Sequence, residues 1–426
     1  MKAAFYTLGC KVNQYESQAM AQSLESHGFE ITDHSEQADV YVINSCTVTA
    51  ESDRKTRQAV RRFKKQHPDS IVVLTGCMPQ AFPEASGNLN EADIVIGNKS
   101  NRLLYDYIMQ YINNRGRIVA VEQHKSGEAF RGDTICSFRE RTRASVKIED
   151  GCNRFCSYCI IPYARGRVRS KPLDELKAEI AALEKNGFSE IVLVGINLSA
   201  YGMGADFNIV DAVRLAASFD GIKRVRLGSL EPDHITDDII AGLAEIPKFC
   251  PQFHISLQSG CDSTLKRMNR HYDSAEYYEL CQKLRAAFDG TTITTDIMVG
   301  FPEETEEDFD ASLKFAEKVG FEKVHVFPYS IRQGTPAAKM KNQVEKAEKE
   351  RRAAKMSAAC EKIRQNFLKN QIGKTLEVLV EEYHEGFAQG YTANYTPVKI
   401  AAEKELHGII KTEITAVDGD FCIGKI

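Results

Sequence analysis

The sequence predicts an α/β protein in three parts: a parallel α/β sheet domain, a partial (β/α)6 barrel and a small β-barrel. Short apolar runs alternate with helical patterns up to about residue 120, and six longer strand–helix repeats follow from residue 144. Short strands separated by turns begin near residue 371. We therefore expect domains at 1–121, 143–370 and 371–426, with a linker at 122–142.

The composition is that of an ordinary globular protein. Hydrophobic residues make up 43% and charged residues 27% of the 426 residues, and no apolar run has transmembrane length. The first residues lead directly into a strand rather than a signal peptide, so we expect a cytoplasmic protein whose twelve cysteines stay reduced. The net charge of −4 gives no global signal for nucleic acid, so any RNA contact must come from local patches.

In the first part, three cysteines follow predicted strands. The strands are expected at residues 2–8, 39–44, 70–75, 93–97 and 117–121. Cys10, Cys46 and Cys77 each come just past the carboxyl end of one of them, which is the edge where open parallel sheets bind ligands. A single cysteine at such a place is more often a small buried residue. Three at equivalent positions predict a metal site, for which no fourth ligand is evident.

A second group of thiols is contiguous. Cys152, Cys156 and Cys159 fall within eight residues, just after a strand expected at 144–149. Thiolates suit iron–sulfur clusters, zinc and copper, and half of a zinc site is the plain alternative. A closed zinc site needs a fourth ligand at similar spacing, and the next candidates are His234 and Cys250. Three cysteines on a cubane cluster would leave one iron open, as catalytic metal sites do.

The second part carries polar residues at the ends of its strands. Strands are expected at 146–148, 190–195, 224–229, 254–258, 292–300 and 323–327, with helices at 173–186, 208–219, 236–245, 263–270, 274–288 and 306–319. Catalytic residues of such barrels come from the carboxyl ends of the strands. Each candidate alone could be ordinary loop chemistry, but their shared rim favours the lining of a site. The candidates are Gly195, Asn197, Ser229, Glu231, Gln258, Ser259, Asp296 and Arg332.

The remaining segments read as structural. Residues 122–142 lack periodicity, and Cys136 within them is expected to be an incidental thiol. Residues 342–369 predict a long solvated helix. Strands are then expected at 375–380, 387–391, 397–400, 407–411 and 421–425.

With these pieces in view, the chain resembles the methylthiotransferases, a radical S-adenosylmethionine (SAM) family, along nearly its whole length. The Cys-x₃-Cys-x₂-Cys spacing with Tyr158 before the last cysteine is similar to that superfamily. Residues 7–16 (TLGCKVNQYE), 300–305 (GFPEET) and 327–338 (FPYSIRQGTPAA) resemble the members that act on threonylcarbamoyladenosine in tRNA. Residues 195–197 (GIN) depart from the Gly-Gln-Asn common in relatives.

The resemblance implies a set of cofactors and a reaction. Two [4Fe–4S] clusters are implied, one on Cys152, Cys156 and Cys159 that cleaves SAM, and one on Cys10, Cys46 and Cys77 that carries the sulfur to be inserted. The implied chemistry is reductive SAM cleavage, hydrogen abstraction from carbon 2 of the adenine, sulfur insertion, and methylation from a second SAM. A TRAM domain at the C-terminus, the tRNA anticodon stem-loop and an electron donor such as flavodoxin or ferredoxin are implied too.

Other functions stay open at this point. The substrate could be the isopentenyl rather than the threonylcarbamoyl adenosine, or an aspartate of a ribosomal protein, and a non-catalytic zinc or redox module is a third class. The segment around Cys10 favours tRNA, and the two groups of three cysteines disfavour the zinc module. The oligomeric state is left open.

Two basic stretches are candidates for RNA contact. Residues 371–426 have five Lys, no Arg and nine Asp and Glu, which suits phosphate poorly. Basic residues gather instead at 54–65 and at 165–171. A solvated helix face or loop is the plain alternative for both, and the second stretch, beside the contiguous cysteines, is the one we expect to contact RNA.

Overall fold

The structure is a computed structural model that describes residues 1–132, 134–135 and 142–426. Residues 133 and 136–141 of the predicted linker, Cys136 among them, lie outside the described residues. No helix in the described part of the chain is long and apolar enough to cross a membrane.

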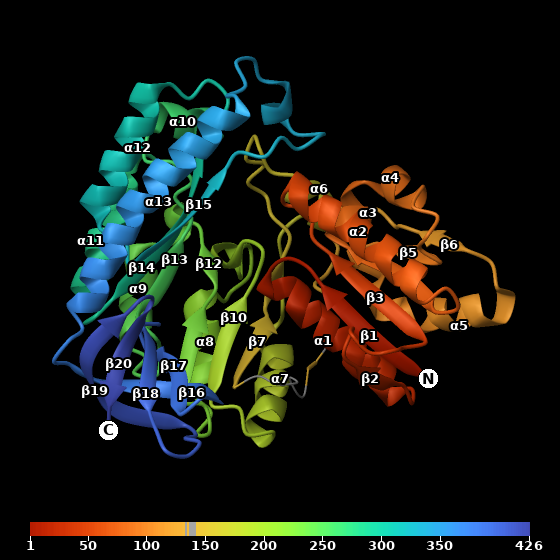
Figure 1. Cartoon of the computed structure of the whole chain (residues 1–426), viewed down its shortest axis with the longest axis horizontal. Helices are drawn as coiled ribbons and strands as arrows, with labels where there is room; N and C mark the ends of the chain where they lie inside the picture. The colour runs from red at the N-terminus through yellow and green to blue at the C-terminus, as the bar shows by residue number, and fades with distance from the viewer. Residues whose placement is uncertain (133, 136–141) are drawn as a thin grey trace.

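The N-terminal part is a six-stranded parallel sheet in the order β2-β1-β3-β4-β5-β6, with a hydrophobic cluster on each face. Its helices cover both faces, as the alternation of strands and helices predicts (Figure 1). The edge strand β2, only three residues long, escaped the prediction. The elements are β1 (Lys2–Thr7), α1 (Lys11–Ser26), β2 (Glu30–Thr32), β3 (Val40–Ser45), α2 (Ala50–Gln66), β4 (Ile71–Gly76), α3 (Cys77–Ala81), α4 (Pro83–Gly87), β5 (Ile94–Ile96), α5 (Leu104–Asn114) and β6 (Ile118–Ala120).

The central part is a partial barrel of parallel strands in two sheets, β11-β10-β7 and β12-β13-β14-β15. The single strand predicted at 224–229 is divided at Gly228, because its first half pairs with β10 and its second half with β13. The elements are β7 (Arg143–Lys147), β8 (Glu149–Asp150), α6 (Ile161–Arg165), β9 (Arg169–Ser170), α7 (Leu173–Lys185), β10 (Glu190–Val194), α8 (Ile209–Ala217), β11 (Arg224–Leu227), β12 (Ser229–Leu230), α9 (Asp237–Ala244), β13 (Gln252–Ile255), α10 (Asp262–Arg267), α11 (Ser274–Ala287), β14 (Thr292–Val299), α12 (Glu306–Val319) and β15 (Lys323–Pro328).

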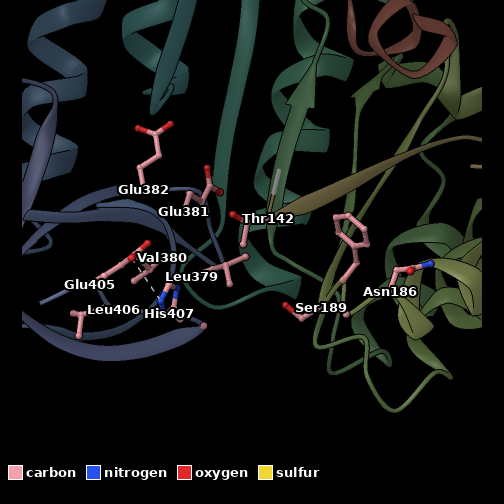
Figure 2. A pocket seen from close by; sticks show the side chains of 13 residues that line it. Thr142, Asn186, Ser189, Leu379, Val380, Glu381, Glu382, Glu405, Leu406 and His407 are labelled. Carbon is pink, nitrogen blue, oxygen red and sulfur yellow. Dashed lines mark ion pairs between the residues drawn. The ribbon is translucent and has the colours of Figure 1, made fainter. Parts of the chain in front are cut away.

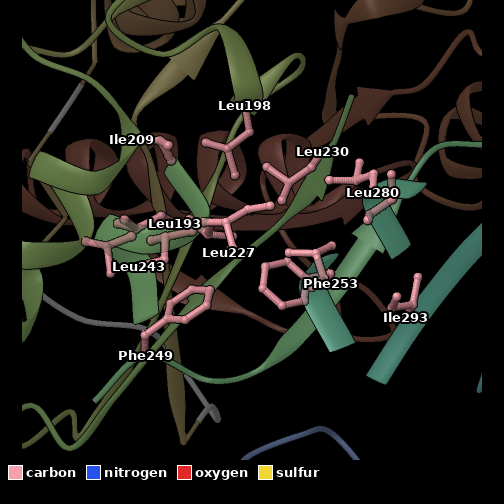
Figure 3. Packing of buried hydrophobic residues seen from close by; sticks show 14 of the residues in the cluster. Leu193, Leu198, Ile209, Leu227, Leu230, Leu243, Phe249, Phe253, Leu280 and Ile293 are labelled. Atoms are coloured by element: carbon pink, nitrogen blue, oxygen red, sulfur yellow. The ribbon is translucent and has the colours of Figure 1, made fainter. Parts of the chain in front are cut away.

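Alternation along the strands separates the barrel's packed face from its interior. Leu193, Phe253 and Ile293 pack with the helices in the large core seen in Figure 3. Their neighbours Val192, His254 and Thr294 line the interior cavity instead. Period-two patterning therefore gives each strand one face for the core and one for a ligand.

The C-terminal part is a closed five-stranded barrel reached through a long helix, as predicted, but the helix is not solvated on all sides, because Met356 and Cys360 pack into the large core. The helix α13 lies across the central part, and the small barrel sits at its far end (Figure 1). The elements are α13 (Lys346–Lys369), β16 (Thr375–His384), β17 (Phe387–Thr392), β18 (Pro397–Ala401), β19 (Ile409–Asp418) and β20 (Phe421–Lys425).

Arginines of β11 fasten this small barrel to the central one. Arg224 donates to the carbonyl oxygens of Glu377 (2.9 Å) and Tyr391 (3.1 Å), and Arg226 donates to the carbonyl of Thr392 (2.8 Å). A pocket of about 340 Å³ opens at the same seam, and Figure 2 shows Glu381, Glu382 and Glu405 around it. Its acidic lining is unsuited to phosphate.

Candidate active site

A cavity of about 840 Å³ lies inside the central barrel, between the N-terminal and C-terminal parts. The N-terminal part closes the open side of the barrel, because α1 packs against β7 and Val12 contacts Val192 and Val194. The loop that carries Cys10 thereby lines the cavity, together with Gly195 and Ser229 from the carboxyl ends of barrel strands.

The three N-terminal thiols converge, as their positions after strands predict. Cys46 follows β3 and is buried, and Cys77 begins α3 directly after β4. Cys10 caps α1 and is exposed. Gly9, at φ +110°, lies so close that a β-carbon there would be 2.8 Å from the Cys46 Cβ. Glycine therefore lets the Cys10 loop approach Cys46.

Polar groups surround these thiols. The Asn13 Oδ1 lies 3.7 Å from the Cys10 Sγ and 4.0 Å from the Cys77 Sγ, and the Asn13 amide donates to the carbonyl oxygens of Leu8 and Ser45. Burial raises the pKa of Cys77 to about 12, with Arg165 acting in the opposite direction and Cys46 and Cys10 adding to the rise. Cys77 therefore needs a bound metal to become a thiolate at neutral pH.

The contiguous thiols sit on a tight loop between β8 and α6. Gly151, at φ +91°, opens the loop, and the Cys152 N–H donates to the Gly166 carbonyl oxygen (3.0 Å). The Cys159 N–H donates to the Cys156 carbonyl oxygen (2.9 Å). Burial raises the pKa of Cys152 to about 12 and also raises that of Cys159.

Arg270 is a polar partner of this loop that the sequence analysis did not identify. Its side chain is 3% exposed, and one Nη donates to the Cys156 Sγ (3.3 Å) and to the Tyr158 hydroxyl oxygen (3.3 Å). The other Nη forms an ion pair with Glu231, a predicted site residue. Arg270 thus joins the cysteine loop to the end of β12.

Two buried polar atoms beside the loop lack a partner among the described residues: the Asn197 Oδ1 and the Glu149 Oε1. The other Glu149 oxygen accepts the Asn197 backbone N–H (2.7 Å), and burial raises the pKa of Glu149 to about 8. A β-carbon at Gly195 would lie 2.6 Å from Glu149 Oε2, so only glycine fits there. Unsatisfied buried polar atoms are costly, so this corner is suited to a polar ligand.

The remaining predicted site residues of the barrel lie in two places, one beside the cavity and one beyond the end of β13. Asp296 pairs with His254 (3.3 Å), which lines the cavity. Gln258 and Ser259 are buried beyond the end of β13, and Gln258 turns to φ +68°. The prediction that His254 to Gln258 form one strand is therefore wrong at its second half. Ser259 accepts the Cys261 N–H (3.2 Å).

Arg332 links two domains. It is 4% exposed, donates to the Thr47 hydroxyl (2.7 Å) and pairs with Asp53 (2.9 Å), both in the N-terminal part. These contacts hold the end of β15 against the loop that follows Cys46. Its predicted contact with SAM stays a prediction.

The prediction of RNA contact at 165–171 is wrong for three of its four basic residues. Arg165 and Lys171 are each 1% exposed and are bound to carboxylates inside the protein, and Arg169 pairs with Asp150 at 3.2 Å. Arg167 alone is exposed, over the ring of Phe155. The helix α2 keeps its basic residues on the outer face, since Thr56, Val60 and Phe63 face inward.

Among the described residues, no three His, Cys, Asp or Glu side chains close around a single metal ion. Each cysteine of a cubane cluster binds a different iron, so its thiols stand further apart than the ligands of one ion. The chemistry of both donor sets, three cysteines without a fourth ligand, fits such clusters.

Sequence comparisons decide between the alternatives. Residues 2–97 match a family described as Uncharacterized protein family UPF0004, and residues 146–316 match the Radical SAM superfamily. The chain is 38% identical over 419 residues to the threonylcarbamoyladenosine tRNA methylthiotransferase MtaB of Bacillus subtilis (strain 168), covering 96% of this chain and 93% of the relative. The chain belongs to the radical-SAM methylthiotransferase family.

Further relatives of this methylthiotransferase are named for two different modified adenosines of tRNA. It is 36% identical to the MtaB of Aquifex aeolicus (strain VF5), covering 97% of this chain and 100% of that one. It is also 33% identical to the tRNA-2-methylthio-N(6)-dimethylallyladenosine synthase of Clostridium perfringens (strain SM101 / Type A), covering 99% and 96%.

The fold has solved counterparts. It resembles the radical SAM methyltransferase TsrM of Kitasatospora setae at a TM-score of 0.56 and 16% identity, covering 79% of this chain and 76% of that one. SAM and [4Fe–4S] clusters are the cofactors of the family, and the two thiol groups and the unpartnered polar corner of this methylthiotransferase fit them.

Proposed function

We propose that this protein inserts a sulfur and a methyl group at carbon 2 of N6-threonylcarbamoyladenosine, next to the anticodon of a tRNA. The observation that carries the proposal is the full-length likeness to threonylcarbamoyladenosine tRNA methylthiotransferases. The two groups of three cysteines, one of them lining the barrel cavity through Cys10, support it.

The two groups have separate tasks in this proposal. Cys152, Cys156 and Cys159 would hold the cluster that binds SAM, and the N-terminal thiols would hold the second cluster. When bound, these groups supply the radical chemistry and the sulfur that an unactivated aromatic C–H bond requires, because acid–base side chains offer no good route to it.

The protein's own residues would bind and orient SAM and keep water away from it. The missing side chain of Gly195 lets the Glu149 carboxyl lie against the cavity wall, and Ser229 lines the same cavity. The free Asn197 Oδ1 and the neutral Glu149 carboxyl offer an acceptor and a donor to the polar end of SAM. The ion pair with Arg270 holds Glu231 in place, and the other carboxylate oxygen of Glu231 would accept a hydrogen bond from the same ligand.

We propose tRNA binding on the outer face of α2, where Lys55 and Lys65 are exposed and have no carboxylate within ion-pair distance in the described structure. Exposed lysines suit a phosphate backbone. The predicted electron donor, a flavodoxin or ferredoxin, and the predicted cytoplasmic location belong to this proposal as well.

The test is mass spectrometry of tRNA nucleosides from a strain that lacks the gene, with and without the gene restored. We expect 2-methylthio-N6-threonylcarbamoyladenosine to disappear in the deletion strain, with its unthiolated precursor accumulating. Loss of the methylthio group from isopentenyladenosine instead would show that the dimethylallyl substrate, named for the Clostridium relative, is the true one.

A further inference from the structure

One arginine of the barrel ends on a thiol of the N-terminal sheet. Arg165 is the last residue of α6, six positions after Cys159, and its side chain is 1% exposed. Its Nε donates to the Cys77 Sγ (3.2 Å), and one Nη donates to the Asn13 Oδ1 (2.8 Å). The chain that follows the contiguous thiols therefore makes direct contact with the dispersed thiols.

A buried charge network holds this guanidinium in place. The carboxylate of Glu16 accepts from both Nη groups of Arg165 (2.6 and 2.9 Å). The Lys147 ammonium donates to Glu16 and to Asp150, each at 2.7 Å, and Asp150 also pairs with Arg169 at 3.2 Å. Bidentate pairing fixes the plane of a guanidinium, so the direction of the Nε toward Cys77 is set by its neighbours.

The network carries one positive charge too many while Cys77 is a thiol. Its cations are Arg165, Lys147 and Arg169, against the two carboxylates of Glu16 and Asp150. An unbalanced buried charge is costly. A metal-bound cysteine sulfur at position 77 would bring negative charge to within hydrogen-bond distance of the Arg165 Nε (3.2 Å).

We propose that Arg165 is a positioning residue that orients Cys77 and raises the reduction potential of the N-terminal iron–sulfur cluster. A charged donor on a ligand sulfur stabilises the reduced, more negative state of a cluster more than the oxidised state. The inference rests on the proposed assignment of Cys10, Cys46 and Cys77 to that cluster. A residue of the central barrel would thereby affect the reduction potential of the cluster in the neighbouring domain.

The experiment is a redox titration of the N-terminal cluster, followed by electron paramagnetic resonance, in the full chain with Cys152, Cys156 and Cys159 changed to Ala. In this background we compare Arg165→Gln, Arg165→Lys and the parent. Arg165→Gln removes the charge and should shift the midpoint potential to a more negative value. Arg165→Lys keeps the charge but not the directed Nε–H, and should give an intermediate shift.

Arg169→Gln is the matched control. It removes a cation from the same network that reaches Cys77 only through Asp150 and Arg165, and it should shift the potential less than Arg165→Gln does. Equal shifts in both variants, or an unchanged potential in Arg165→Gln or Arg165→Lys with iron fully loaded, would overturn the inference. If Arg165→Gln loses its iron, Arg165→Lys decides by the same criterion.

A different outcome would contradict the proposed function rather than the role of Arg165. If the background variant, with its N-terminal cysteines intact, takes up no iron at all, the second cluster is absent and the assignment of its three ligands is wrong. An iron-loaded background with no response to Arg165 leaves the assignment standing and removes only the role of the arginine.

Discussion

The two groups of thiols are built in opposite ways. Cys152 to Cys159 are neighbours in sequence, and one loop opened by Gly151 sets their relative positions. The N-terminal thiols come from three loops separated by more than thirty residues each, so the parallel pairing of β1, β3 and β4 brings them together.

The partners of the two groups differ as well. Arg270 serves the contiguous group from within its own barrel, through Cys156 and Glu231. Arg165 serves the dispersed group from the other domain. The contiguous group and its arginine thus belong to one barrel, whereas the arginine of the dispersed group reaches it only where two domains meet.

The largest expected effect tests the contiguous group. Changing Cys152, Cys156 and Cys159 to Ala should remove about half of the iron, because anaerobic reconstitution should give about eight irons per chain, four in each [4Fe–4S] cluster. Reductive cleavage of SAM to deoxyadenosine should be abolished. Iron analysis and product chromatography measure both, and unchanged iron together with bound zinc would contradict the two-cluster assignment.

The second prediction removes the dispersed group. The variant with Cys10, Cys46 and Cys77 changed to Ala should still cleave SAM, because the contiguous loop has its own ligands and its own arginine. It should form no methylthiolated tRNA. Deoxyadenosine and modified nucleosides are measured in the same reaction.

Two results would change the comparison. Methylthiolation at the parent rate would show that the N-terminal thiols are structural. Loss of SAM cleavage in a folded variant would show that the groups are coupled, and the network from Arg165 through Asp150 to the start of the cysteine loop would be the connection to test next.

The sequence predicted each group to the extent that its geometry is local. Spacing alone identified Cys152 to Cys159, and the rule for strand ends identified Cys10, Cys46 and Cys77. The contacts of Arg165 and Arg270 depend on which residues meet across a domain or a barrel, which periodicity does not encode. A run of basic residues therefore suggested RNA contact for Arg165, whereas the fold buries it against Glu16.

The sequence also predicted the ends of two strands incorrectly. Residues 224–229 and 254–258 both read as continuous strands, but pairing changes at Gly228, and β13 ends at Ile255 with an isolated bridge from Gln258 to Ile297 beyond it. Hydrophobic alternation predicts which face is buried and does not report where a curved sheet opens. Glu149 was missed for a similar reason, since its burial follows from the loop beyond β10 folding over it.

A smaller effect tests the arginine of the contiguous group. Arg270→Met should lower the free energy of unfolding by about 3 kcal/mol, because Glu231 loses its partner in a largely buried pair. Adding Glu231→Gln should recover part of this loss, since no unpaired charge remains. Arg214→Ala, whose side chain is 55% exposed, is the control and should cost less than about 0.5 kcal/mol. Denaturant unfolding measures all four proteins, and a full loss that persists in the double variant would contradict the ion-pair explanation.

The last effect is a dependence of stability on pH and concerns Glu149, which has a raised pKa and lies beside the contiguous group. Burial raises the pKa of Glu149 from an ordinary 4.5 to about 8, so between these values the folded protein holds a proton that the unfolded chain releases. Its contribution to the free energy of unfolding therefore falls as pH rises, by at most about 1.4 kcal/mol per pH unit, and levels off above about pH 8. Glu149→Gln holds no such proton, so the stability of this variant relative to the parent should grow between about pH 5.5 and about pH 7.5.

Denaturant unfolding of both proteins across this range measures the difference, and Glu175→Gln on the exposed side of α7 controls for the loss of a carboxylate. The N-terminal group has a similar buried acid in Glu16, but there Arg165 and Lys147 outweigh burial and lower the pKa. Glu16→Gln should therefore destabilise the protein near neutral pH, the opposite sign to Glu149→Gln. If both substitutions changed stability in the same direction at about pH 7.5, the contrast between a neutral acid beside one group of thiols and a paired acid beside the other would be wrong.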